Sequence, residues 1–363
     1  MYLNYKLYWK NVILIIKVLA IITIFFQSNS CSNTTINGSN DIFPSTEIAL
    51  LLPLEAQSDQ TNELATNLMN SARLAARDLD YLNLKLSIYP TSGDQTRAMH
   101  AAKAAVENGA QIIVGPLFSK ETQAVKNTLK DKNIKIISLS NDPTVAGGNV
   151  FIMGTTFQNS ASRLVQFALS KDLRRIAVIG PKGELGVNGI RAAENAIKES
   201  GAILTTSALY PLDVKGISEI SPRIYTTLIK GDSQAIIFTD SPTRGLGFIT
   251  EQLYQEYEKN NNKLPQFMGL TRWDSSKQLL NEVSINKGWF VIPDQRFKKQ
   301  FQKRYSKVFG TYPSEVSSLS YDAIALIGGV LKKNDTIIGS EKFNHRHFFD
   351  QNGFVGVNGI FRF

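Results

Sequence analysis

The sequence predicts an α/β protein of two lobes, each built on a doubly wound parallel sheet with helices on both faces. Three observations support this prediction. Short β-branched runs alternate along the chain with stretches of helical period, which is the pattern of parallel strands joined by crossover helices. The length of 363 residues, 43% of them apolar, is sufficient for about two cores of ordinary domain size. The composition is neither that of a disordered chain nor that of a fibrous one.

The first lobe is expected over residues 46–150, where strand and helix signals follow one another in four units. Its predicted strands are 47–52, 84–89, 112–114 and 135–138, and its predicted helices are 62–80, 96–108 and 119–130. The first of these helices has a continuous apolar face, formed by Leu64, Leu68, Ala72, Ala75 and Leu79. Such a face predicts that the helix packs against the sheet.

A second series of the same kind is expected over residues 151–292. Its predicted strands are 175–179, 202–208, 235–238, 266–269 and 288–292, and its clearest helices are 159–170, 187–200 and 246–259. Two long helices, 295–309 and 317–331, fall in residues 293–335, which we expect to return to the first lobe. The closing segment, 336–363, is assigned to the second lobe.

The first 30 residues differ from the rest of the chain. Their only charges are Lys6, Lys10 and Lys17, and the apolar run 18–26 follows, as in a secretory signal peptide. Even an apolar stretch counted over 12–26 is shorter than the ~20 residues of a spanning helix. An uncleaved membrane anchor is the alternative.

Cys31 is the only cysteine of the chain and lies five residues after the apolar run. A bacterial lipoprotein carries its lipid-modified first residue at this place, although Ser28 and Asn29 depart from the usual signal; the alternative is an incidental free thiol. The following residues, to position 45, are rich in Ser, Asn and Thr and are typical of a flexible tether. The membrane is therefore expected as a partner only through the signal or a lipid anchor.

The charge balance does not favour a nucleic-acid partner. Lys and Arg exceed Asp and Glu by 40 to 31, for a formal net charge of +9. The basic residues are scattered, however, and no base-reading motif accompanies them, which is typical of a solvated surface.

Nothing in the sequence predicts an enzyme, a metal site or a cofactor. No Gly-x-Ser-x-Gly elbow, phosphate loop or zinc-protease motif occurs. The three histidines are His100, His345 and His347. The last two could share a metal by spacing, but no cysteine or acidic cluster accompanies them, so we interpret them as a surface pair.

Ligands of doubly wound sheets bind outside the carboxyl ends of the strands. The loops expected to form such a cleft are 53–57, 91–94, 115–119 and 139–142 in the first lobe, and 180–186, 239–243 and 270–273 in the second.

Four stretches of the chain resemble the Leu/Ile/Val-binding type of periplasmic binding protein. They are 71–79, 112–119, 301–313 with 320–323, and 353–363. The resemblance implies the type I periplasmic binding protein fold, with two Rossmann-like lobes joined by a hinge. It also implies a receptor that captures a small amino-acid-like ligand and presents it to an ABC-type permease.

The loop 115–119 is the predicted carboxylate seat. Gly115 and Pro116 end the strand sharply, and Ser119 is expected to cap the next helix with its hydroxyl. The free N–H groups at the start of that helix would bind an anion, although a simple helix cap without a ligand is the alternative. The resemblance implies that Ser119 binds the ligand carboxylate.

The remainder of the site matches the family less well. A hydroxyl-bearing loop is expected at Ser138, Ser140, Asn141 and Asp142. The family's acid for the ligand ammonium is replaced by Thr271, which puts a standard branched-chain amino-acid site in doubt.

An unpaired buried ammonium is costly, so a substitute for the missing acid is expected. Asp142 and Asp240 are the candidates. Phe118 and Phe157 are the nearest aromatic wall residues, and both could equally be core residues.

A second function remains open. The tether, the departures in the pocket and the ending 356–363 also resemble penicillin-binding-protein activators, lipoproteins that stimulate peptidoglycan synthases. In that case the partner would be a synthase rather than a permease. We favour the ligand-binding role because the carboxylate seat is intact.

Overall fold

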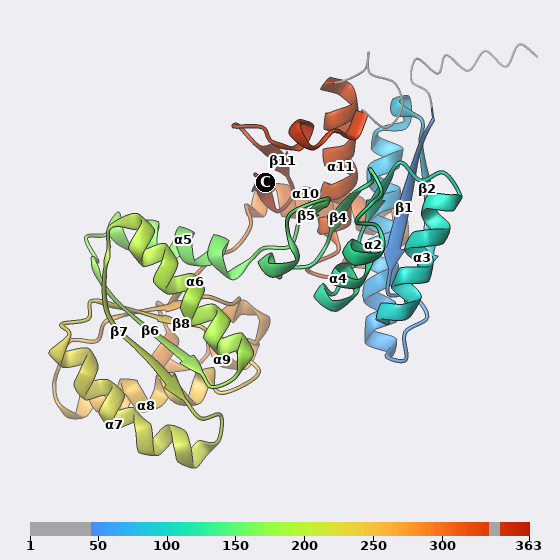
Figure 1. Ribbon diagram of the computed structural model, residues 1–363. Helices are drawn as coiled ribbons and strands as arrows, with labels where there is room; N and C mark the ends of the chain where they lie inside the picture. Colours follow the sequence, from blue (N-terminus) through green and yellow to red (C-terminus); the bar gives the residue numbers. More distant parts are fainter. Residues whose placement is uncertain (1–44, 334–341) are drawn as a thin grey trace, which may run out of the picture. The chain divides into compact units, whose positions relative to one another are not determined.

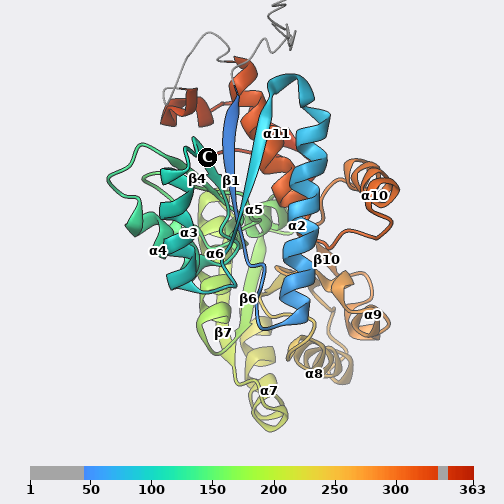
Figure 2. The same ribbon diagram turned by 90° about the vertical axis from the view of Figure 1, so that its right-hand side faces the viewer.

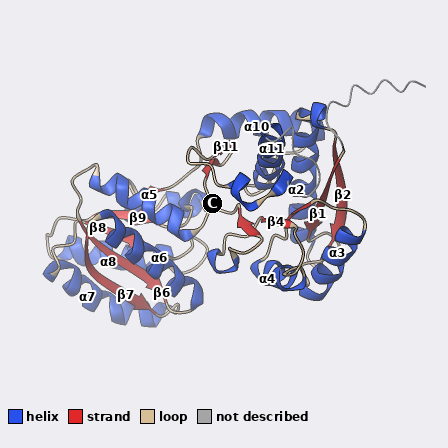
Figure 3. Ribbon diagram, turned by 45° about the horizontal axis from the view of Figure 1, so that its top comes forward, coloured by secondary structure: helices blue, strands red, loops and turns tan. Residues whose placement is uncertain are grey.

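The computed structural model describes residues 45–333 and 342–363, and it confirms the predicted α/β class. Two five-stranded parallel sheets are each flanked by helices (Figure 1; Figure 3). The predicted signal peptide, the tether and Cys31 lie outside the described residues. None of the helices in the described ranges combines the length and apolar character that crossing a membrane requires.

The first sheet has the strand order β2-β1-β3-β4-β5, with every neighbouring pair parallel. Its strands are β1 (Thr46–Leu52), β2 (Leu84–Pro90), β3 (Ile112–Val114), β4 (Lys135–Ser138) and β5 (Val150–Ile152), and its helices are α2 (Asp59–Asp78), α3 (Gln95–Glu107) and α4 (Ser119–Thr128). The sequence prediction missed β5 and set its lobe boundary inside that strand. Only the short turn Pro143–Val145 separates β5 from β4, so β5 lacks the crossover helix that marks strands in an alternating pattern of strands and helices.

The second sheet has the order β10-β9-β8-β6-β7 and is also parallel. Its strands are β6 (Arg175–Pro181), β7 (Ile203–Tyr210), β8 (Ala235–Phe238), β9 (Gln266–Gly269) and β10 (Trp289–Phe290), and its helices are α5 (Phe157–Leu169), α6 (Glu184–Ser200), α7 (Val214–Lys230), α8 (Leu246–Lys259) and the short α9 (Lys277–Leu280).

Central strands such as β1, β3 and β8 are buried on both faces, which explains why they are nearly continuous apolar runs. In β1, Ile48, Leu50 and Leu52 belong to the apolar cluster on one face, whereas Ala49 and Leu51 belong to the cluster on the other. This alternation is the two-residue period of a strand. Each fully buried Leu or Ile contributes about 1.5–3 kcal/mol, so the helices that cover the two faces are held by the strands beneath them.

The chain returns to the first lobe through α10 (Gln295–Phe309) and α11 (Ser318–Lys333). Helix α11 packs against α2, as the red and blue helices of Figure 2 show. Buried apolar residues of α11, among them Ala323, Ile327 and Val330, share one cluster with the first-lobe strands. Helix α11 is therefore part of the core of the first lobe.

The closing hairpin, β11 (Phe354–Gly356) and β12 (Gly359–Phe361), corrects the prediction that residues 336–363 belong to the second lobe. Within residues 342–363, the apolar side chains pack on the core of the first lobe. Phe348 is fully buried there and stacks on Phe151, with ring centroids 4.5 Å apart. The apolar side chains of the segment decide this placement, because they bury area on the nearest incomplete core.

Asp322 attaches this hairpin to α11. Its Oδ1 accepts the Val357 N–H at 2.7 Å, and its Oδ2 accepts the Asn358 N–H at 3.0 Å and the Asn358 side-chain amide at 2.8 Å. The residue as a whole is 2% exposed. Burial raises the pKa of Asp322 to about 6, although the three donors act in the opposite direction.

Gly115 sets the path of the chain between β3 and α4. Its φ of 95° lies in the region that favours glycine, and a Cβ at this position would lie 2.1 Å from the Leu51 carbonyl oxygen. The Gly115 N–H donates to the Ile137 carbonyl at 2.8 Å. The turn is therefore packed against β1 and tied to β4, and only glycine fits there.

We expect Asp322→Asn to lower the free energy of unfolding by about 1–3 kcal/mol at pH 7, because one oxygen becomes an amide nitrogen that cannot accept a bond from Val357 or Asn358. The pH dependence has a definite sign. The folded pKa, about 6, lies above the ordinary value of 3.8, so this carboxyl stabilises the fold most below pH 3.8 and loses that contribution as the pH rises through 6.

Urea denaturation between pH 4.5 and 7.5 checks this expectation. The wild-type protein should lose about 2 kcal/mol more stability over that interval than the Asn variant. Identical pH profiles of the two proteins would contradict the assignment.

We also expect Gly115→Ala to destabilise the protein more than Gly109→Ala. Both glycines have a positive φ, 95° and 86°, but a Cβ at Gly109 meets nothing within 4 Å. The loss of stability in Gly109→Ala measures backbone strain alone, about 1 kcal/mol. The loss in Gly115→Ala includes the clash with Leu51 as well. Denaturant titration of both variants gives the difference; equal losses would show that the close approach is unimportant.

Candidate ligand-binding site

The strand-end loops of the first lobe enclose two adjacent pockets. The α2–α3 pocket, about 450 Å³, is bounded by the starts of α2 and α3, including Ser58 and Asp94. The α3–α4 pocket, about 470 Å³, is lined by Gly93, Gln95, Leu117, Phe118, Ser119, Lys120, Glu121, Ser140 and Asn141. Phe118 and Gly93 line both. A pocket of about 530 Å³ lies at the amino ends of second-lobe strands and contains none of the predicted site residues.

The loop that was predicted to bind a carboxylate leads into a helix start, but the cap of that helix differs from the prediction. Helix α4 begins at Ser119, and Phe118 is the N-cap, with no side-chain capping bond. The expectation that the Ser119 hydroxyl caps the helix is therefore wrong, because Phe118 takes the extended backbone conformation that the cap requires. The first-turn amides have no acceptor within the helix. Ser119 lines the pocket, whereas Gly115 is buried behind it.

Phe118 and Phe157 differ in their surroundings. The Phe118 side chain is 40% exposed and forms a wall common to the two pockets. Phe157 is the first residue of α5, and its side chain packs against an apolar cluster of the second lobe. Phe157 is thus at least partly a core residue, which was the alternative that the sequence left open.

The hydroxyl-bearing loop after β4 is held by its own side chains. Ser138 is fully buried, and its hydroxyl lies 2.8 Å from that of Thr122 and 3.2 Å from the Pro116 carbonyl. The same hydroxyl accepts the Ser140 N–H at 3.1 Å. Ser138 therefore positions Ser140, and of these two serines only Ser140 lines the α3–α4 pocket.

Asn141 and Asp142 follow in the same loop. Asn141 is exposed and lines the α3–α4 pocket. The Asp142 Oδ1 accepts the backbone N–H of Thr144 at 2.9 Å and its hydroxyl at 2.7 Å. These bonds cap the short turn Pro143–Val145, so the carboxylate of Asp142 is already used within the loop.

Asp240, the candidate acid of the second lobe, is 1% exposed and bonded through both of its oxygens. Its Oδ2 accepts the Tyr210 hydroxyl at 2.7 Å and the Gly245 N–H at 3.0 Å, and its Oδ1 accepts the Ser241 N–H at 2.8 Å. Burial, with the charge of Asp240 beside it, raises the pKa of Tyr210 well above its usual range. Asp240 therefore holds the loop after β8 in place.

Thr271, which was predicted to replace the family's acid, donates its hydroxyl to the Asp240 carbonyl at 2.7 Å. The structure thus brings Thr271 and Asp240 together, but it does so through the backbone of Asp240. Neither the Thr271 hydroxyl nor the Asp240 carboxylate is left without a partner.

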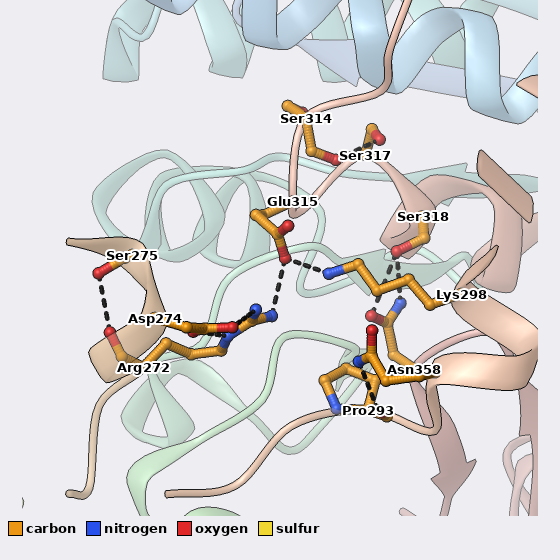
Figure 4. Close-up of polar contacts among 11 residues, drawn as sticks. Arg272, Asp274, Ser275, Pro293, Lys298, Ser314, Glu315, Ser317, Ser318 and Asn358 are labelled. Atoms are coloured by element: carbon orange, nitrogen blue, oxygen red, sulfur yellow. Dashed lines mark hydrogen bonds and ion pairs between the residues drawn. The ribbon is translucent and has the colours of Figure 1, made fainter. Parts of the chain in front are cut away.

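An ion-pair network that the sequence did not predict begins at the next residue. Arg272 Nε donates to Asp274 at 2.8 Å, and its Nη1 donates to Glu315 at 2.7 Å (Figure 4). Glu315 also pairs with the ammonium of Lys298, which is 5% exposed. The hydrogen bond from Arg272 lowers the pKa of Asp274. These contacts connect the loop after β9 with α10 and the segment before α11, over separations that no sequence pattern reveals.

Glu121 was also missed. The residue is fully buried although it lines the α3–α4 pocket. Neither carboxylate oxygen makes a hydrogen bond of normal geometry within the part of the chain that the structure describes. Burial raises the pKa of Glu121, while the Thr91 hydroxyl and the Phe118 backbone act in the opposite direction. A sequence shows only an acid in the first turn of a helix, which is common and usually exposed.

The histidine pair has structural contacts. The His345 ring lies 5.1 Å from that of Phe151, and the His347 Nδ1 lies 3.1 Å from the Lys342 carbonyl oxygen. Within residues 45–333 and 342–363, no group of three or more His, Cys, Asp or Glu side chains is arranged to bind a metal ion.

Known proteins resemble this chain over most of its described length. A family model described as periplasmic binding protein matches residues 47–344. A curated relative, an uncharacterized protein of Rickettsia prowazekii, is 22% identical over 164 residues, which is 45% of this chain and 43% of that relative. The chain thus matches less than half the length of this relative.

Three solved structures show the same fold. A protein from Rhodospirillum rubrum, described as a branched-chain amino acid ABC transporter, has a TM-score of 0.72 at 15% identity, over 88% of this chain and 93% of that one. An ABC transporter substrate-binding protein from Desulfitobacterium hafniense in complex with Leu has 0.60 at 16% identity, over 88% and 93%. A solute-binding protein from Rhodopseudomonas palustris in complex with 3,4-dihydroxybenzoic acid has 0.55 at 13%, over 87% of each chain.

At these identities the solved structures establish the fold and not the ligand. The family match covers both parallel sheets and both returning helices. This chain therefore belongs to the periplasmic binding protein family, with the type I periplasmic binding fold, and this membership implies a periplasmic location.

Proposed function

We propose that this protein is a periplasmic receptor for a small, carboxylate-bearing, amino-acid-like solute, which it presents to an ABC-type permease. The observation that carries the proposal is the α3–α4 pocket, which lies at the start of α4. The first-turn amides of a helix and its dipole favour an anion at that end. Ser119 and Ser140 supply hydroxyl groups beside it.

The structural neighbours support a carboxylate as the common element of the ligand. Leucine and 3,4-dihydroxybenzoic acid, which are bound in two of them, share a carboxyl group and little else. A family fold that accepts both is consistent with one conserved way of binding the carboxylate and variable surroundings for the rest of the ligand. We propose that the loops 239–243 and 270–273 of the second lobe complete the site when the lobes close on the ligand by a hinge motion.

The peptidoglycan-synthase activator that the sequence also suggested is not favoured by any observation on the described residues. It remains the function to which an absence of ligand binding would point. The lipid anchor at Cys31 and the tether up to position 45 form a further part of the proposal, because a receptor held at the membrane stays close to its permease.

We expect at least one amino acid or small carboxylic acid to stabilise the purified full-length protein. A ligand at 100 times its dissociation constant should add about 2.7 kcal/mol to the free energy of unfolding, because it binds only the folded state. Thermal melting against a panel of both compound classes measures this. A panel without any shift would contradict the receptor function.

We expect Cys31→Ala to move the protein from the membrane fraction to the soluble fraction of cells, because a lipid chain at this position would be the main anchor. Immunoblotting of separated fractions checks the distribution, with Ser30→Ala as a control that leaves the thiol in place. If the alanine variant stays in the membrane fraction, an uncleaved N-terminal helix or a protein partner holds it there.

A further inference from the structure

We propose that Glu121 supplies the counter-charge for an ammonium group of the ligand, so that the first turn of α4 recognises both charged ends of an amino-acid-like molecule. The inference rests on the proposed function, since it assumes that the ligand occupies the α3–α4 pocket. It adds the ligand class, a zwitterion rather than a simple carboxylic acid, and a recognition residue that has no counterpart among the predicted ones.

The state of Glu121 is the first argument. Its side chain is 0% exposed, lines the α3–α4 pocket, and has no hydrogen bond of normal geometry to either oxygen among the described residues. A buried carboxylate without a partner costs several kcal/mol. The Thr91 hydroxyl and the Phe118 backbone act on this carboxylate and lower its pKa, but neither contact has normal hydrogen-bond geometry. A ligand group with several N–H donors would supply the hydrogen bonds that these two contacts do not complete.

The second argument is that the other candidate acids are occupied. Asp240 accepts three hydrogen bonds, and Asp142 caps its own turn. In the two pockets, Asp94 caps α3 through the Arg97 N–H at 2.8 Å, and Glu55 lies 3.7 Å from the Arg97 guanidinium. With Thr271 in place of the family's acid, the counter-charge for an ammonium has to come from elsewhere, and Glu121 meets that requirement.

The third argument is the position of Glu121 along the helix. Ser119 and Glu121 occupy the first and third positions of α4, and both line the same pocket. The carboxylate and the ammonium of an α-amino acid are attached to one carbon atom, so one helix turn can reach both. The ammonium would donate to Glu121 while the first-turn amides donate to the carboxylate.

Proton release on ligand binding would distinguish a binding role of Glu121 from a purely structural one. Burial raises the pKa of Glu121 in the ligand-free protein, although the Thr91 hydroxyl and the Phe118 backbone act in the opposite direction. An ammonium at hydrogen-bond distance favours the ionised form, so binding should release a proton near the raised pKa. Lys120 lies on the same turn and is the other charged residue that lines the pocket.

A structural alternative has to be separated from this proposal. Glu121 is the third residue of α4, and the glutamate of a capping box reaches back from that position to the N-cap amide, here that of Phe118. In that role Glu121 would stabilise the helix start and would have no effect on which ligand binds.

The test uses the full-length wild-type protein and matched pairs of ligands. Each common L-amino acid is compared with the acid that lacks only its amino group, such as leucine with 4-methylpentanoic acid, by thermal melting and titration calorimetry. We expect at least one amino acid to bind at least tenfold more tightly than its amino-free counterpart. Its binding should release protons, measured in two buffers of different ionisation enthalpy.

Two variants assign this preference to the residue. Glu121→Gln should lower the affinity for that amino acid by about 10- to 100-fold and abolish the proton release. Glu107→Gln, which removes the same charge at the exposed end of α3, should change neither. Without ligand, the Glu121→Gln variant should have an equal or higher melting temperature than the wild type, whereas a capping role predicts a lower one.

The outcomes separate the two proposals. If no compound of either series binds, the receptor function itself fails. If acids bind as tightly as their amino counterparts, or if Glu121→Gln leaves affinity and proton release unchanged, the receptor function stands and the role of Glu121 is overturned. The comparison within ligand pairs uses the wild-type protein, so it remains decisive even if the variant is unstable.

Discussion

The approach of the Gly115 backbone to the Leu51 carbonyl is the constraint on which the candidate site depends. Parallel pairing brings the ends of β1, β3 and β4 to one edge of the first sheet. Because no side chain separates residue 115 from β1, the chain can turn at once and start α4 beside that edge. The amino end of α4 is thereby placed next to the loops that follow the other strands, and its first-turn amides have no acceptor within the helix.

The acids of the two lobes illustrate how context assigns a role to a residue. Asp240, Asp142 and Asp322 are carboxylates that hold loops or hairpins through backbone N–H groups. Each accepts hydrogen bonds from donors within the chain, so each stabilises the fold. Glu121 is buried without comparable bonds, and this difference in satisfaction, rather than residue type or proximity to a motif, marks it as a candidate for binding.

The network of Arg272, Asp274, Glu315 and Lys298 joins segments that are far apart in the sequence. An exposed ion pair contributes only about 0–1 kcal/mol, but the Lys298 ammonium is buried and needs the Glu315 charge. The network follows Thr271 directly along the chain. The loop after β9 is therefore anchored through Arg272, and the charges of Arg272 and Asp274 are paired within this network.

The sequence by itself determined the fold class, most of the strands and helices in their order, and the loops that follow the strands. Periodicity carries that information locally, which is why the bounds of β3, β4, β8, β9, α8 and α10 agree with their predictions residue for residue. The strand β5 escaped prediction because no crossover helix separates it from β4 in the sequence. Only the tertiary structure decided that the closing hairpin packs on the first lobe, that Ser138 and Asp240 serve the fold, and that Glu121 is buried without normal hydrogen bonds. Those properties depend on which groups meet across the core, and a local pattern does not contain the distances between residues far apart in the chain.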